Sequence, residues 1–294
     1  MAVAPTDLTL AAAPATPRGR MATYVRRHPT IVVGGGLLAL MVAMAIFAPY
    51  LGTVDPQALA PAKRLKWPSA EYWFGTDMFG RDVYSRTIYG ARVSLAVGIS
   101  VALLAVGLGM AIGLVSGFNR WVDAIVMRVM DGLMSIPAIL IAIALMALNR
   151  ASLQNVILAI TVAEVPRVTR LVRGVVLTLR EQPYVEAAIA SGTVSIKILW
   201  RHIVPNTMAP VLVQGTFIAA SAMITEAILS FIGAGTPPTI PSWGNIMAEG
   251  RSLFQLAYYI VLFPGIMLSV TVLGINLLGD GLRDALDPRL ARRL

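Results

Sequence analysis

Residues Glu186–Pro205 read E-A-A-I-A-S-G-T-V-S-I-K-I-L-W-R-H-I-V-P, a polar stretch between two long apolar runs. Pro183, just before it, suits the first turn of a helix, because no backbone N–H is needed there. A helix is therefore expected over 184–191. Gly192 suits the position just past a helix end, where the backbone becomes left-handed and glycine is favoured. The stretch thus opens with a short helix that ends at a glycine.

A second helix is expected after that glycine. Thr193 or Ser195 can cap a helix over 196–204. Pro205 lacks a backbone N–H and tends to end or bend the helix before it. The stretch therefore predicts two short helices joined at a glycine hinge, outside the bilayer that the flanking runs cross.

The composition is that of a membrane protein. Hydrophobic residues make up 57% of the 294 residues and charged residues 13%, whereas soluble domains carry about a quarter charged residues. A membrane-spanning helix needs about 20 apolar residues, and runs of that reach recur along the chain. We therefore expect an all-α membrane protein with about six transmembrane helices.

Six spans are expected along the sequence. They cover about 31–48, about 93–115, a third that continues to about residue 148 with a bend at Pro137, a fourth from about residue 156, about 208–232 and about 257–278. Gly109, Gly113 and Gly117 recur every four residues in the second span and predict a flat face for close helix packing.

The distribution of charge predicts the orientation in the membrane. Most of the 24 Lys and Arg residues fall inside if both termini are cytoplasmic, which agrees with the positive-inside rule. This orientation also puts the stretch 186–205 in the cytoplasm. The net charge of +9 is explained by this bias and by anionic lipid, and no nucleic-acid motif argues for a nucleic-acid partner.

Residue types exclude several kinds of site. The chain has no cysteine and two histidines, His28 and His202, so neither thiolate nor histidine-built metal sites are expected. No G-x-x-x-x-G-K-[ST] phosphate loop, H-E-x-x-H or G-x-S-x-G motif is present. We therefore expect no catalytic residue, no metal and no cofactor on this chain, and we do not expect an enzyme.

The stretch that opens this section resembles the EAA loop of ABC-importer permeases: E-A-A, three residues, G, nine residues, I-x-L-P. The matching positions are Glu186, Ala187, Ala188, Gly192 and Pro205. His202 stands where the pattern has Ile, and Val204 where it has Leu. In that family the loop is a coupling helix that docks into a cleft on a separate ATPase, so the resemblance assigns this role to these residues, including His202.

Two further segments resemble signatures of dipeptide and oligopeptide permeases. Residues 75–82 read G-T-D-M-F-G-R-D, as in G-T-D-x-x-G-R-D, and 226–244 contain E-A-I-L-S-F-I-G followed by P-S-W-G. Asp77 is expected to cap the following helix and Asp82 to pair with Arg86. Just after the second segment, Glu249 is expected to pair with Arg251.

The resemblance covers the chain from about residue 28 to the end and is closest to the C-type subunit of dipeptide or oligopeptide importers. It implies a type I ABC importer permease fold in four parts. These are a disordered cytoplasmic tail (1–28), a first transmembrane helix with an extracytoplasmic segment (29–91), an ABC transmembrane type-1 domain with its coupling loop at 182–206 (92–280), and a cytoplasmic tail (281–294).

The resemblance also implies a complex in the inner or plasma membrane. A homologous B-type permease, two ATPase domains and an extracytoplasmic peptide-binding protein are the implied partners, besides the lipid bilayer. ATP and magnesium are expected on the ATPase subunits. The chain would form half of a pathway for di- or oligopeptides and work by alternating access; nickel, glutathione and haem-type compounds are alternative substrates within the family.

Four polar residues within apolar runs are candidates for the pathway or its gate: Glu164, Gln214, Glu226 and Asn276. A near-membrane Glu164 is functional by default, but a salt bridge to Arg167 is the simpler interpretation. Arg167, Arg170 and Arg173 follow at three-residue spacing and share one side of a helix. A proton-coupled secondary transporter that uses Glu164 or Glu226 as a relay is the alternative from another class.

Overall fold

The computed structural model describes residues 28–148 and 150–286. The long helices are α2 (Pro29–Ile46), α3 (Val83–Phe118), α6 (Leu153–Arg180), α9 (Val204–Phe231) and α11 (Tyr259–Leu286). The shorter helices are α4 (Arg120–Met134), α5 (Ala138–Ala147), α7 (Pro183–Ala190), α8 (Ser195–Ile198) and α10 (Trp243–Gly250). A π-helical turn, Leu199–Ile203, joins α8 to α9, and 3-10 turns lie at Ala48–Tyr50, Pro61–Lys63 and Arg251–Leu253.

The predicted cytoplasmic tails fall mainly outside the described residues, on 1–27 and 287–294. The start of the predicted C-terminal tail, 281–286, continues α11 as helix.

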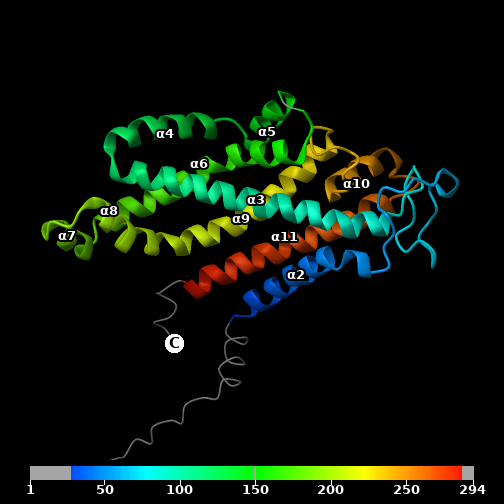
Figure 1. Cartoon of the computed structure of the whole chain (residues 1–294), viewed down its shortest axis with the longest axis horizontal. Helices are drawn as coiled ribbons and strands as arrows, with labels where there is room; N and C mark the ends of the chain where they lie inside the picture. The colour runs from blue at the N-terminus through cyan, green and yellow to red at the C-terminus, as the bar shows by residue number, and fades with distance from the viewer. Residues whose placement is uncertain (1–27, 149, 287–294) are drawn as a thin grey trace, which may run out of the picture.

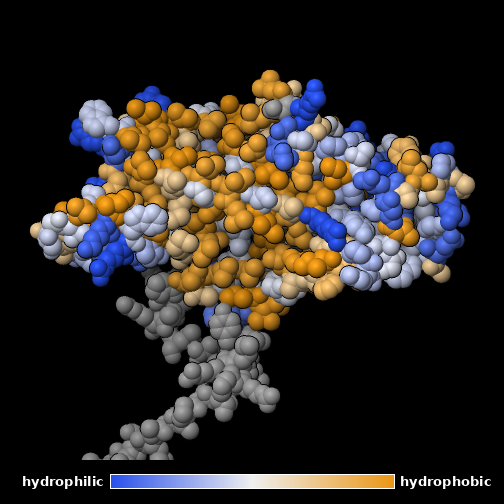
Figure 2. Space-filling model, viewed as in Figure 1, coloured by the Kyte–Doolittle hydropathy of each residue, from blue (hydrophilic) through white to orange (hydrophobic). Residues whose placement is uncertain are grey.

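The long helices run side by side along the long axis of the molecule (Figure 1). The turn between α7 and α8 lies at one end, and the segment 47–82 with α10 lies at the other, which we call the distal end (Figure 1). Figure 2 shows hydrophobic residues over the middle of the visible face and hydrophilic residues gathered towards both ends. This is the surface expected of a bundle that crosses a bilayer along its long axis.

The predicted all-α membrane fold is confirmed. In the residues that the structure describes, four helices can cross a membrane by length and composition: α2, α3, the continuous run Ser195–Phe231, and α11. The pair α4 and α5, bent by 87° at the break that holds Pro137, makes a fifth if it is one span. Helix α6, with 28 residues, is long enough for the sixth expected span, but its arginines lower its hydropathy.

Helices α3 and α6 approach closely along the predicted glycine face. A Cβ added at Gly109 would lie 2.5 Å from Cβ of Val168, and one added at Gly117 would lie 2.5 Å from a methyl of Val176. The valines of α6 thus occupy the space that side chains would need. Small residues allow backbones within lipid to pack this closely, so this seam orients α6 on the bundle.

Helix α3 begins ten residues before the span expected from hydropathy. Asp82 caps it, since its carboxylate accepts a hydrogen bond from the Ser85 N–H at 2.8 Å. The prediction that Asp77 caps this helix and Asp82 pairs with Arg86 was therefore wrong: the two aspartates have exchanged roles.

Asp77 instead belongs to a buried distal ion cluster with Arg81, Arg86 and Glu249. Arg86 lies 2.6 Å from Asp77 and 2.5 Å from Glu249, and Arg81 makes the same two pairings. The Arg86 side chain is only 1% exposed. Glu249 is therefore not paired with Arg251 as predicted, because the cluster already holds its carboxylate; Arg251 donates to the Phe231 carbonyl. The cluster joins the distal segment, α3 and α10.

Aromatic side chains fasten the same end. The Tyr259 hydroxyl donates to the carbonyls of Lys66 and Thr76, both at 3.0 Å. The indole N–H of Trp243 donates to the Thr87 carbonyl at 2.9 Å. Buried indole and phenol groups are stable where the polar tip has a partner. The Tyr259 bonds fix α11 against the distal segment, and the Trp243 bond fixes α10 against α3.

We expect Gly109→Ala to destabilise the protein by about 1–3 kcal/mol, the cost of overpacking a close contact. The new methyl would meet Val168 at 2.5 Å, whereas a Cβ at Gly107 of the same helix meets nothing within 4 Å. Gly107→Ala is therefore the control. Thermal unfolding midpoints in detergent compare the variants, and equal midpoints would contradict the packing of this seam.

Arg86→Met should cost about 3–5 kcal/mol, because it leaves buried carboxylates without a counter-charge. Lys63→Met breaks the exposed Lys63–Glu71 pair at 3.5 Å and should leave the unfolding midpoint near that of the wild type, since exposed ion pairs contribute little. The same thermal measurement serves both. A midpoint for Arg86→Met as high as that of the control would show that the distal ion cluster does not stabilise the fold.

Candidate functional site

The hairpin formed by α7, α8 and the π-helical turn is the first candidate site. Gly192 has φ +74°, its N–H donates to the Ile189 carbonyl at 2.9 Å, and the Thr193 N–H donates to the Ala188 carbonyl at 3.1 Å. This pair of bonds closes a helix whose next residue is left-handed. The predicted glycine hinge is confirmed. A Cβ at Gly192 would meet nothing within 4 Å, so backbone conformation alone favours glycine.

The second half of the hairpin differs from the prediction. Val194, not Thr193 or Ser195, occupies the N-cap of α8, without a side-chain hydrogen bond. Pro205 does not end the helix: it lies in the first turn of α9, directly after the π-helical turn. The wider turn lets the chain pass a residue that has no N–H to donate, so Ser195–Phe231 forms one continuous helical run.

The residues of the predicted coupling loop face different ways. Ala188 packs against the hydrophobic core, whereas Glu186, Ala187 and Pro205 are exposed. The Glu186 carboxylate makes no hydrogen bond or ion pair within the residues that the structure describes. The His202 ring lies 5.9 Å from the Tyr184 ring, which is a contact between the two arms of the hairpin.

The hairpin also presents apolar side chains to solvent, which sequence reasoning missed. The exposed members are Tyr184, Ile189, Val194, Ile196 and Trp200. We call this set the hairpin apolar surface. Trp200 is 66% exposed. Lys197 and Arg201 lie beside it in the chain. An apolar surface rimmed by charge, beyond the hydrophobic band of the bundle, is typical of a protein interface.

Buried contacts tie the hairpin to the bundle. Val185 of α7 and Ile198 of α8 belong to the same core as Val176 of α6. Arg180, the last residue of α6, donates to the Gly117 carbonyl of α3 at 2.8 Å. A displacement of the hairpin must therefore displace the ends of α6 and α9.

The pathway candidates Glu164 and Gln214 lie on one seam, between α6 and α9. Glu164 is buried; its carboxylate accepts from the Ser221 hydroxyl at 3.3 Å and lies 3.5 Å from Arg167. The predicted salt bridge is thus present, at a long distance. Leu171 lies seven residues after Glu164 on α6, and Gln214 lies seven residues before Ser221 on the antiparallel α9. Both line the same cavity.

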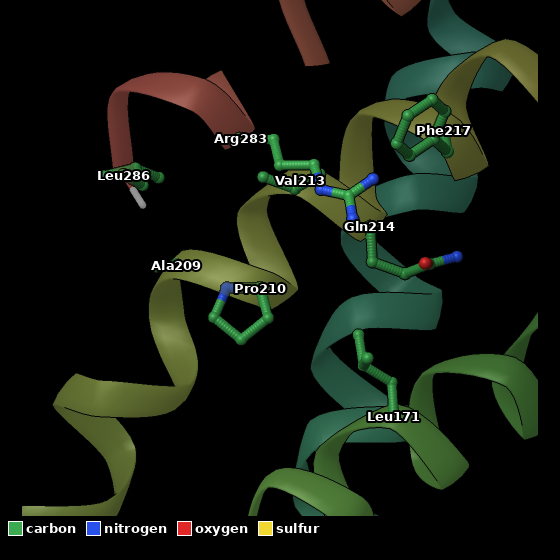
Figure 3. A pocket seen from close by; sticks show the side chains of 8 residues that line it. All are labelled: Leu171, Ala209, Pro210, Val213, Gln214, Phe217, Arg283 and Leu286. Atoms are coloured by element: carbon green, nitrogen blue, oxygen red, sulfur yellow. The ribbon is translucent and has the colours of Figure 1, made fainter. Parts of the chain in front are cut away.

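This cavity has a volume of about 440 Å³ and lies between α6, α9 and the end of α11. Arg283 extends from α11 towards the turn of α9 that carries Val213 and Gln214 (Figure 3). No carboxylate lies within ion-pair distance of Arg283 in the described part of the chain. The cavity is therefore a mixed space, apolar on most sides, with a guanidinium and an amide in it.

The other two pathway candidates lie elsewhere. Glu226 is buried at the distal end, where one carboxylate oxygen accepts from the hydroxyls of Ser230 and Ser242, both at 2.8 Å. Ser242 also caps α10 by accepting from the Asn245 N–H at 3.2 Å. Glu226 thus fastens the loop before α10. Asn276 is half-buried on α11, and its side chain has no recorded hydrogen bond in residues 28–148 and 150–286.

Helix α4 supplies counter-charges to α6. Arg170 pairs with Asp131 at 2.5 Å, and Arg173 makes a bidentate pair with Asp123. Because Asp131 faces Arg170 across the two helices, it does not pair with Arg128 of its own helix. In the described residues, no group of three or more His, Cys, Asp or Glu side chains is placed so that it could hold a metal ion.

Comparison with known families agrees with this architecture. Residues 104–292 match the binding-protein-dependent transport system inner membrane component family, and residues 16–68 match the N-terminal TM domain of oligopeptide transport permease C. Among solved structures, the MetNI methionine ABC transporter in an inward-facing conformation shares the fold, with a TM-score of 0.52, 19% identity, and coverage of 68% of this chain and 95% of that chain.

Several relatives are similar over most of their length. A probable peptide ABC transporter permease of Sinorhizobium fredii is 52% identical over 97% of this chain and 99% of the relative. The dipeptide permease DppC of Alkalihalophilus pseudofirmus is 42% identical (90% and 88%), and the glutathione permease GsiD of Pectobacterium atrosepticum is 39% identical (91% and 89%). The chain therefore belongs to the inner membrane components of binding-protein-dependent transport systems, the permease proteins of ABC transporters, and is a multi-pass membrane protein.

Proposed function

We propose that this chain is a permease subunit of an ATP-driven importer and forms half of the pathway for di- or oligopeptides. The names of its relatives support a peptide substrate. Glutathione permeases are also among them, and glutathione itself contains two amide bonds and free carboxylates. Nickel and haem-type compounds are less supported, because the relatives described above are named for peptides or glutathione.

The observation that carries the proposal is the hairpin apolar surface. Tyr184 and Trp200 stand exposed at the end of the bundle, where they would be costly unless a partner covers them. Exposed aromatic residues of this kind are the usual anchors of protein interfaces. The partner that fits is an ATPase subunit, which binds the ATP and magnesium that this chain has no phosphate loop to hold.

The implied complex contains this chain, a homologous permease, two ATPase domains and an extracytoplasmic substrate-binding protein. The hairpin and both termini are then cytoplasmic, which agrees with the basic side chains of Arg180, Lys197 and Arg201 at that end. The distal end, held by its ion cluster, faces the binding protein.

The mechanism follows from how the hairpin is attached. ATP binding closes the ATPase pair and shifts the equilibrium between permease states, because ATP binds one state more tightly. The hairpin follows its ATPase, and α6 and α9 follow the hairpin because buried contacts join them. The seam between α6 and α9 therefore opens alternately to the two sides.

A proton-coupled carrier is the alternative from another class. It would use Glu164 or Glu226 as the relay, and uptake would then stop with a protonophore and continue without the ATPase. Glu226 is enclosed by Ser230 and Ser242, and membership of the ABC permease family disfavours this alternative.

We expect Gly192→Val to abolish most of the ATPase stimulation that the loaded binding protein gives, while Gly192→Asn retains it. A left-handed backbone costs a β-branched residue about 1–3 kcal/mol, whereas asparagine adopts it readily. ATPase activity of the reconstituted importer is the readout. Equal loss of ATPase stimulation in both variants would show that the left-handed backbone at Gly192 is not required for coupling.

Trp200→Ala should weaken binding of the ATPase by roughly 30-fold or more, as expected for an interface anchor. Phe254→Ala is the control, because Phe254 is similarly exposed at 57% but lies at the distal end. Co-purification of the ATPase with each variant measures the effect. Undiminished co-purification with Trp200→Ala would remove the hairpin apolar surface from the interface.

A further inference from the structure

Arg167 places a positive charge near the middle of α6. The helix has 28 residues, so a rise of about 1.5 Å per residue puts Arg167 roughly 20 Å from either end. Its neighbour Val168 packs on Gly109 of α3. No charged residue occurs in α3 between Arg92 and Phe118. Arg167 therefore lies at the depth of the apolar core of the membrane.

A charge at this depth does not face lipid. Charged side chains within spans face the protein interior or a water-filled space. The Arg167 side chain is nevertheless 52% exposed on this chain. It must therefore face water or the second permease subunit, and in either case the interior of the assembled transporter.

Within the described part of the chain Arg167 has one ion pair, which leaves most of its donors unused. One nitrogen lies 3.5 Å from Glu164, whose side chain is buried and also held by Ser221. A guanidinium has five N–H donors in a fixed plane. The buried carboxylate thus contacts one nitrogen of the guanidinium, and no other hydrogen bond of this side chain is present within residues 28–148 and 150–286.

Arg170, one turn further along α6, is as exposed as Arg167 but has a much closer acidic partner. Its side chain is 50% exposed, but Asp131 holds it at 2.5 Å. Its charge is therefore neutralised by a close partner on α4. Arg173 is likewise bound by Asp123. Among the three arginines of this row, Arg167 has the loosest ion pair.

Towards the hairpin end, the cavity described above begins one turn beyond Arg167. Leu171 lies one turn further along the same face of α6 and lines the 440 Å³ cavity with Gln214 and Arg283 (Figure 3). The seam thus presents a guanidinium, an amide and a second guanidinium in succession. All three can donate hydrogen bonds, and two are positively charged.

We propose that Arg167 binds a carboxylate of the transported substrate at mid-membrane depth, and that this contact selects for substrates with a free carboxylate. The proposal rests on the proposed function, since it assumes that the seam between α6 and α9 lines the pathway. A guanidinium binds a carboxylate through two parallel hydrogen bonds. Glu164 is a positioning residue, because it orients the guanidinium without contacting the substrate.

The test compares two substrates in the reconstituted importer with its permease partner, ATPases and binding protein. Uptake of alanyl-phenylalanine and of its C-terminal amide is measured for the wild type, Arg167→Gln, Arg167→Lys and Arg170→Gln. Each substrate is supplied at a concentration that saturates the binding protein. Because every variant uses the same binding protein, its own preference cancels when ratios of uptake are compared between variants.

Arg167→Gln should lower the ratio of acid to amide uptake about tenfold, the usual effect of losing charge-assisted hydrogen bonds. Arg167→Lys should restore part of the ratio, and Arg170→Gln should leave it at the wild-type value. An unchanged ratio in Arg167→Gln overturns the proposal. Equal loss of uptake for both substrates also overturns it and indicates a contact with the partner permease.

A second measurement tests whether water reaches the site. The chain contains no cysteine, so Arg167→Cys introduces the only thiol of this subunit. We expect a charged thiosulfonate reagent to label it, and not to label Leu108→Cys, which is equally exposed at 51% on the apolar part of α3. Absence of labelling at position 167 places the side chain against protein and overturns the proposal.

The same measurements distinguish failure of the proposed function from failure of the carboxylate site alone. If the wild-type importer hydrolyses ATP in response to its binding protein but takes up neither compound, the peptide substrate is wrong and the carboxylate site falls with it. If the wild type takes up the dipeptide and only the ratio is insensitive to Arg167, the proposed function stands and this inference alone fails.

Discussion

Close contact between the backbones of α3 and α6 is the constraint on which the rest of the structure depends. Lipid offers little hydrophobic drive for one helix to bind another, so helices in membranes rely on fit. The glycines of α3 supply that fit, and the valines of α6 fill it. Once α6 is placed, Arg170 and Arg173 pair with α4, and Arg180 at its end donates to the Gly117 carbonyl of α3.

Electrostatics then divides the molecule into regions with different tasks. At the distal end, opposite charges are buried against one another, which holds a long irregular segment on the bundle. Along α6, two half-exposed arginines differ in the distance to their acidic partners: Arg167 lies 3.5 Å from Glu164, whereas Arg170 lies 2.5 Å from Asp131. At the hairpin, exposed charge flanks apolar side chains. Buried ion pairs fix structure when fully matched, whereas a half-exposed and loosely matched guanidinium is free to bind something else.

The parts that could be predicted from the sequence depend on near neighbours in the chain. The glycine at the end of α7, the bend at Pro137 and the glycine face of α3 all follow from rules that span a few residues, and each is confirmed. The pairing of Glu249 with Arg86 could not be predicted, since the two residues are 163 positions apart. Local spacing favoured Arg251 as the partner of Glu249 and a capping role for Asp77.

The site was predicted only in part. The E-A-A and glycine positions located the hairpin, but which of its side chains are exposed depends on how it packs, and spacing alone did not show the hairpin apolar surface. Pro205 was expected to interrupt the helix because the rule for proline assumes an α-helical turn before it. A π-helical turn precedes it instead. Glu164 and Gln214 were chosen for polarity, and only packing shows that they share one seam while Glu226 does not.

The uninterrupted helical run Ser195–Phe231 has a mechanical consequence. Its 37 residues give a length of about 55 Å at a rise of about 1.5 Å per residue. One end carries the hairpin apolar surface, and the other carries Glu226, which anchors the loop before α10. A long helix converts a small tilt into a large displacement. If the run tilts by about 5° about one end, its other end moves by roughly 5 Å, which is about the rise of one helical turn. A small tilt of the run at the hairpin would thereby shift the loop before α10 at the distal end.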